Sequence, residues 1–82
     1  MGHYGKAPAA FIEVEAKQIR EAEKAYLIRL IQPGTDMDGV EFWCPKSQIQ
    51  RIVTPVDQKA NKRFFIAQWL MEKKIDEVFG TN

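Results

Sequence analysis

The segment VEFWCPKSQI, residues 40–49, begins as a strand and breaks halfway. Successive side chains of a strand point to opposite faces, so Phe42 and Cys44 are expected on one face and Trp43 on the other. Pro45 has no N–H group to give to a neighbouring strand, and the strand should therefore end at this proline or lie at a sheet edge. The segment predicts a strand followed directly by a corner.

The residues after the proline predict a short helical turn. The hydroxyl of Ser47 is a typical helix cap, and Lys46 is expected on the surface with its charged end in water. Ile49 is then expected under the sheet, as a core residue. The run RIVT, residues 51–54, predicts a brief strand after the turn because three of its residues are good β formers.

The chain before this corner predicts a β-hairpin. Apolar and charged side chains alternate over residues 11–17, and the run AYLIRLI, residues 25–31, is rich in β-forming residues. Ile19 breaks the alternation, which predicts a bulge or a strong twist near Lys17–Gln18. A helix over residues 13–31 is the alternative, because Glu, Ala, Lys and Arg are good helix formers.

The last third of the chain predicts a strand and a closing helix. The run RFFI, residues 63–66, is interpreted as the last strand, although a single longer helix from Asn61 is an alternative. Apolar residues recur at roughly helical spacing over residues 68–79, and Gly80 stands where a C-terminal cap is expected. Trp69 is expected to pack into the core from this helix.

Short strands, tight turns and one closing helix predict a mainly β, β-rich α+β domain. The expected architecture is a small, strongly bent sheet or a partly open barrel of SH3-like or OB-like size, with a short C-terminal helix. QPGTDMDG, residues 32–39, is dense in turn residues, and residues 56–62 form a polar loop. A single domain is expected over residues 10–79, with tails at 1–9 and 80–82.

The charge balance limits the kinds of partner. The chain has 82 residues, with 12 Lys and Arg against 11 Asp and Glu, which gives a net charge of +1. Any basic surface must therefore be a local patch. No apolar run approaches the roughly 20 residues of a membrane span, so no membrane partner is expected. A single cysteine is typical of a reducing compartment.

No arrangement of residues predicts an enzyme. A catalytic Cys44 would need a base, and the only histidine is His3, in the predicted tail. The expected alternation makes Cys44 a small core residue instead. Lys46 and Ser47 form an adjacent pair that is common by chance, and the acidic residues of 36–41 are too few for a calcium loop. The sequence therefore predicts no catalytic residue, no metal site and no cofactor.

The corner does predict a binding surface. A tryptophan on the solvent side of a sheet can stack on a base or anchor a protein partner, although Trp43 is also able to pack in the fold. The corner would bring Lys46 close to this ring at the sheet rim. Basic side chains beside aromatic rings form surfaces for single-stranded nucleic acid. The candidate binding residues are Trp43, Lys46, Arg51, Lys62, Arg63 and Phe64; a merely solvated loop is the alternative for the cations.

Three segments together resemble a family of very small phage and prophage proteins: FIEVEAKQIREAEKAYLIRL, EFWCPKSQI and FFIAQWLMEKK. The family pattern is a charged hairpin, a W-I-P-K-S-Q-I segment and a closing I-P-x-W-L-A-E-E-K segment. The resemblance spans about residues 11–75, with Cys44 in place of the Ile, Ala67 in place of the second Pro, and a long QPGTDMDG turn. It implies the cytoplasm of a bacterial host and a genetic context of replication and recombination, but no established activity.

Two functions follow as hypotheses. The first is a non-enzymatic accessory protein that binds single-stranded nucleic acid, and the second is an adaptor or inhibitor that binds a phage or host protein. Basic residues clustered around Trp43 would favour the first. An apolar patch rimmed by the mixed charges of the 13–24 hairpin would favour the second. The small core and unprotected edge strands suggest a monomer or a homodimer.

Overall fold

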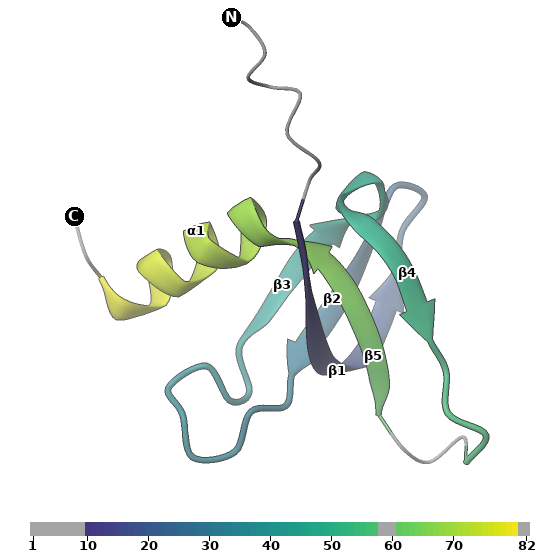
Figure 1. Cartoon of the computed structure of the whole chain (residues 1–82), viewed down its shortest axis with the longest axis horizontal. Helices are drawn as coiled ribbons and strands as arrows, with labels where there is room; N and C mark the ends of the chain where they lie inside the picture. Colours follow the sequence, from purple (N-terminus) through teal and green to yellow (C-terminus); the bar gives the residue numbers. More distant parts are fainter. Residues whose placement is uncertain (1–9, 58–60, 81–82) are drawn as a thin grey trace, which may run out of the picture.

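A computed structural model describes residues 10–57 and 61–80 of the chain. Within these residues the elements are β1 (Phe11–Glu21), β2 (Ala25–Leu30), β3 (Glu41–Pro45), the 3₁₀ helix η2 (Lys46–Gln48), β4 (Ile49–Val53), β5 (Lys62–Ala67) and α1 (Gln68–Phe79). The strands form one open antiparallel sheet in the order β3-β2-β1-β5-β4 (Figure 1). The predicted fold class is confirmed: a mainly β chain with one C-terminal helix. The predicted tail at 1–9, and residues 81–82 of the predicted tail at 80–82, lie outside the described residues.

The predicted hairpin is confirmed as β1 and β2, and the alternative helix over residues 13–31 is wrong. Gln18 pairs with Ile28 and Arg20 pairs with Leu27, so the register shifts at Ile19, just beyond the position predicted for the bulge. β1 is the central strand because its first half pairs with β5 and its second half with β2. The bulge therefore interrupts only the half of β1 that pairs with β2.

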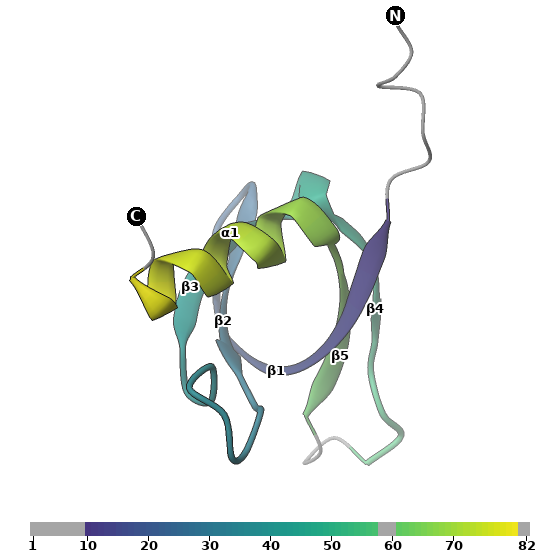
Figure 2. The same ribbon diagram turned by 60° about the vertical axis from the view of Figure 1, so that its left-hand side comes forward.

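The short η2 connection requires the sheet to curl. β3 and β4 are the two edge strands, yet only three residues separate Pro45 from Ile49. Such a connection spans at most about 14 Å, whereas the edges of a flat five-stranded sheet would be about 19 Å apart. The edges must therefore approach each other at this end. Figure 2 shows the strands curving round, with α1 lying across the open side of the sheet.

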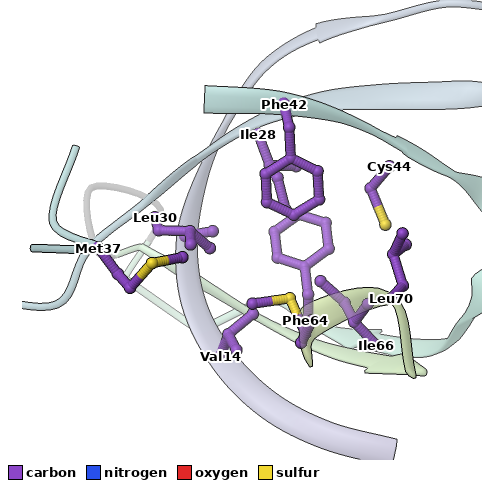
Figure 3. Packing of buried hydrophobic residues seen from close by; sticks show 11 residues of the cluster. Val14, Ile28, Leu30, Met37, Phe42, Cys44, Phe64, Ile66 and Leu70 are labelled. Atoms are coloured by element: carbon purple, nitrogen blue, oxygen red, sulfur yellow. The ribbon is translucent and has the colours of Figure 1, made fainter. Parts of the chain in front are cut away.

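The core fills the concave face of the curled sheet. The buried apolar residues are Val14, Ala16, Ile28, Leu30, Met37, Phe42, Cys44, Phe64, Ile66, Ala67, Leu70 and Met71. In Figure 3 the side chains of Phe42 and Phe64 extend toward each other across the core, and Cys44 lies close to Leu70 of α1. Every strand except β4 supplies at least one of these residues, so the core depends on the curl.

The corner is confirmed at Pro45, which ends β3. The prediction for Ser47 is wrong, because η2 begins after Pro45 and has no side-chain cap hydrogen bond. Its first backbone N–H, that of Lys46, instead donates to the carbonyl of Lys24 at 2.8 Å. Ile49 is half-buried and packs against the core cluster, and the predicted strand at 51–54 is β4.

The predicted last strand and closing helix are both confirmed, and the alternative helix from Asn61 is wrong. The helix α1 begins at Gln68 and ends at Phe79. Gly80 adopts the left-handed conformation, with φ of 68°, and its N–H donates to the carbonyl of Glu77. A glycine at this position avoids the steric strain that other residues meet there, so the C-terminal cap was readable from the sequence.

Ile49→Ala is expected to lower the free energy of unfolding by about 1–2 kcal/mol, because a half-buried side chain loses part of its core contact. Ser47→Ala in the same corner should change it by less than about 0.5 kcal/mol, since no cap bond is lost. Urea unfolding followed by circular dichroism measures both. A larger loss for Ser47→Ala than for Ile49→Ala would contradict this account of the corner.

Candidate functional site

Trp43 lies on the convex face of the sheet, opposite the core, and its side chain is 46% exposed. In the strand register it is opposite Leu27 of β2, and Leu27 is opposite Arg20 of β1. These three residues, Arg20, Leu27 and Trp43, form what we call the convex row. The row contains one aliphatic side chain, one large aromatic ring and one cation. Aromatic rings and arginines are enriched at the centres of recognition surfaces.

The bulge at Ile19 decides the position of Arg20. Ala16 and Gln18 point to the concave side, so uninterrupted alternation would place Arg20 there as well. The extra residue reverses the alternation, and Arg20 then lies on the same face as Lys17. Bulges commonly redirect a side chain in this way. The sequence predicted a bulge, but the prediction did not include the reversal of side-chain alternation beyond it. Arg20 was therefore not among the predicted binding residues.

The neighbouring row carries mixed charge. Arg29 forms an ion pair with Glu41, with 2.6 Å between the nitrogen Nη2 and the oxygen Oε2, and Lys17 is opposite Arg29 in the register. Among residues 10–57 and 61–80, Lys17 and Arg20 have no carboxylate partner. The apolar centre of Leu27 and Trp43 is therefore rimmed by one neutralised pair and two free cations.

Lys46 does not stand beside Trp43 as the sequence suggested. It follows Cys44 in the strand alternation, so it projects from the concave side, where its Nζ lies 2.6 Å from Glu21 Oε2 and 4.9 Å from the centre of the Tyr26 ring. The hydrogen bond to Glu21 raises the pKa of Lys46. Because consecutive side chains of a strand point to opposite faces, a ring and a cation three residues apart are separated by the sheet.

Arg63 and Arg51 lie on the convex face, but over β5 and β4, away from Trp43 on β3. The guanidinium of Arg63 donates to Glu13 at 2.8 Å, and this hydrogen bond raises the pKa of Arg63. The guanidinium of Arg51 lies 4.2 Å from the centre of the Phe65 ring. The structure therefore places these two predicted cations on adjacent strands, with Arg63 three strands and Arg51 four strands from Trp43 in the sheet order.

Lys62 and Phe64 complete the predicted set, and Phe64 must be removed from it. Lys62 donates from Nζ to Gln18 Oε1 at 3.1 Å. Phe64 is fully buried and meets Tyr26 edge-on, with 6.4 Å between the ring centres. The outward ring of this pair of phenylalanines is Phe65, because adjacent side chains of a strand take opposite faces.

The core prediction for Trp69 is also wrong. Trp69 is 55% exposed, and the buried side chains at this end of α1 are those of Leu70 and Met71. The indole Nε1–H donates to Gln48 Oε1 of η2 at 3.0 Å, which holds the ring against the corner. Trp69 is thus a second exposed tryptophan, on α1 and outside the convex row.

Cys44 is a core residue, as predicted. Its side chain is fully buried, and burial raises its pKa to about 11, an effect that the positive charge of Lys74 partly opposes. A nucleophilic cysteine acts as the thiolate and needs a lowered pKa. The environment of Cys44 thus raises the pKa of its thiol, whereas nucleophilic catalysis requires a lowered pKa.

No group of three or more His, Cys, Asp or Glu side chains that could hold a metal ion occurs in the described part of the chain. In the same residues no helix is long and apolar enough to cross a membrane. The chain matches no protein-family model, and searches of curated proteins and of solved structures give no match either.

Proposed function

We propose that this chain is a non-enzymatic accessory protein of a phage or prophage that binds another protein through the convex row. The observation that carries the proposal is the half-exposed ring of Trp43 beside Leu27, rimmed by Arg20, Lys17 and the Arg29–Glu41 ion pair. Tryptophan and arginine dominate binding energy at protein interfaces, and a polar rim excludes water from such a centre.

The positions of the cations favour a protein partner over nucleic acid. Of the four cations predicted to surround Trp43, Lys46 and Arg63 are paired with carboxylates and Lys62 is hydrogen-bonded to an amide. Arg51 lies on β4, where its guanidinium stacks on the Phe65 ring at 4.2 Å from the ring centre. The surroundings of Trp43 are instead a small apolar patch with mixed charge, which resembles the core and rim of a protein interface.

Trp43→Ala is expected to weaken binding to the partner protein by about 2 kcal/mol or more, which is roughly thirtyfold in Kd. The partner would be captured from a bacterial lysate by the immobilised chain, purified, and titrated against both proteins by calorimetry. Trp69→Ala is the matched control, because it removes from α1 a tryptophan that is even more exposed, 55% against 46%, and it should leave Kd within about threefold. Equal losses for the two variants would contradict a site centred on the convex row.

Single-stranded nucleic acid is the second candidate, and the two unpaired cations Lys17 and Arg20, on the same convex face two strands from Trp43, favour it. If an oligonucleotide is the ligand, Trp43→Ala loses about 1–3 kcal/mol of stacking. Arg20→Ala then reduces the salt dependence of binding by about 0.7 for the lost phosphate contact. Fluorescence anisotropy with labelled oligonucleotides at low salt measures both effects. Binding with these signatures would place nucleic acid ahead of the protein partner.

A further inference from the structure

We infer that two copies of this chain associate through the free edge of β3, with a two-fold axis at Trp43, so that their sheets join into one continuous antiparallel sheet. β3 pairs with β2 on one side only, and its other edge carries no strand among the described residues. An exposed edge of this kind is a template for pairing with another chain. The second copy is the occupant that the backbone pattern of β3 fits.

The hydrogen bonds that flank β3 show which backbone groups face outward. The N–H of Leu30 donates to the carbonyl of Val40 at 2.9 Å, and the N–H of Lys46 donates to the carbonyl of Lys24 at 2.8 Å. In an antiparallel ladder the residues that bond to a given neighbour alternate along the strand. Residues 40, 42, 44 and 46 therefore bond toward β2, and Glu41, Trp43 and Pro45 direct their backbone groups to the free edge.

These outward groups are complementary to themselves. With Trp43 placed opposite Trp43 of the second copy, each tryptophan N–H meets the carbonyl of the other. Two residues along, the N–H of Glu41 meets the carbonyl of Pro45 in the second copy. Pro45 lacks an N–H, so only the carbonyl of Glu41 remains without a donor. The two-fold arrangement thus uses every outward N–H that β3 presents.

The other sheet edge is distorted by a bulge, and the β3 edge is not. β4 has a register shift between Ile49 and Arg51, which distorts its ladder, and bulges of this kind discourage edge pairing. The β2–β3 ladder has no such shift. The one ionisable side chain that β3 carries on its solvent side, Glu41, is already bound to Arg29. β3 therefore has neither a register shift nor a free charge at its edge, and Pro45, which ends the strand, still offers its carbonyl to a second copy.

Strand pairing would extend the convex row without covering it, because side chains stand perpendicular to a sheet and the edge bonds lie in its plane. The row would then run from Arg20 through Leu27 and Trp43 to the same residues of the second copy. One row alone exposes two apolar side chains, which is little beside the roughly 800 Å² that each partner buries in a standard interface. Dimerisation would double this apolar centre.

The test is to measure the mass of the chain in solution after removing one outward N–H. Cys44 is the only cysteine and directly follows Trp43, so fragments 1–43 and 44–82 can be ligated at this junction, with or without a methyl group on the backbone nitrogen of Trp43. Sedimentation velocity over about 10 µM to 1 mM should show a concentration-dependent dimer for the unmethylated chain. Methylation should raise its dissociation constant about tenfold or more, because two hydrogen bonds are lost.

Glu41→Pro and Glu41→Gln provide a second, recombinant comparison, with circular dichroism confirming that each is folded. Both remove the ion pair with Arg29, but only the proline removes an outward N–H, so only Glu41→Pro should weaken the dimer. A monomer at every concentration would overturn the inference and leave the edge to an extended segment of another protein. A dimer of equal strength in the methylated chain and in Glu41→Pro would also overturn it, since another surface would then hold the copies together.

Discussion

Phe64→Ala is expected to lower the free energy of unfolding by about 3–5 kcal/mol, because the ring is fully buried and its removal leaves a large cavity in the core. The Phe64 ring meets the Tyr26 ring in a T-shaped arrangement, and its side chain extends toward that of Phe42 across the core (Figure 3). A chain of this size has a thin core, so that the loss is a large fraction of its total stability. Urea unfolding followed by circular dichroism measures the change.

Phe65→Ala is the matched control, since it deletes the same side chain one residue later, on the convex face under Arg51. Its expected loss is below about 1.5 kcal/mol. If Phe64→Ala leaves no folded protein, Phe64→Leu should still unfold cooperatively at a lower urea concentration than the natural chain. A greater loss for Phe65→Ala than for Phe64→Ala would mean that the two rings are assigned to the wrong faces.

Raising the pH from about 9 to above 11 is expected to remove about 2–3 kcal/mol of stability through Cys44 alone. Burial raises the pKa of the folded thiol to about 11, from an ordinary value of 9.0. The unfolded chain therefore loses this proton first, and the stabilisation is fully present below pH 9 and is lost as the pH rises through 11. Urea unfolding at a series of pH values measures the decline.

Cys44→Ala is the control for this pH dependence, because lysines and tyrosines titrate in the same range. The cavity left by the smaller side chain should lower stability about equally at every pH, so the difference between the two proteins isolates the thiol. The folded thiol should also react slowly with a thiol reagent at neutral pH. Rapid labelling without unfolding, or an equal decline in Cys44→Ala, would show that the thiol is not buried as described.

The two exposed tryptophans show that the burial of an aromatic side chain depends on how the secondary-structure elements pack together. The alternation around Pro45 correctly separated Trp43 from Phe42 and Cys44, and the structure leaves the Trp43 ring half-exposed. The helical spacing of the apolar residues in α1 predicted that Trp69 would be buried. The side of the helix that packs into the core is instead the one that carries Leu70 and Met71. A helix with apolar residues on several faces has no unique buried side until the sheet beneath it is in place.

The sequence by itself determined the features that depend on neighbouring residues. Proline ends a strand because its own nitrogen lacks a hydrogen, and Gly80 closes a helix because its own backbone tolerates a positive φ. The alternation of polar and apolar residues likewise identified the strands and the hairpin. Each of these effects depends only on residues that are close together in the chain, so a short stretch of sequence is enough to predict it.

Only the tertiary structure decided which residues meet across the sheet. The curl follows from linking opposite edge strands by η2, and the site changed because the bulge at Ile19 turned Arg20 to the convex face. The carboxylates that bind Lys46 and Arg63 are 25 and 50 residues away in the chain. Strand order and register bring such distant side chains together, and neither is contained in the local pattern of the residues concerned.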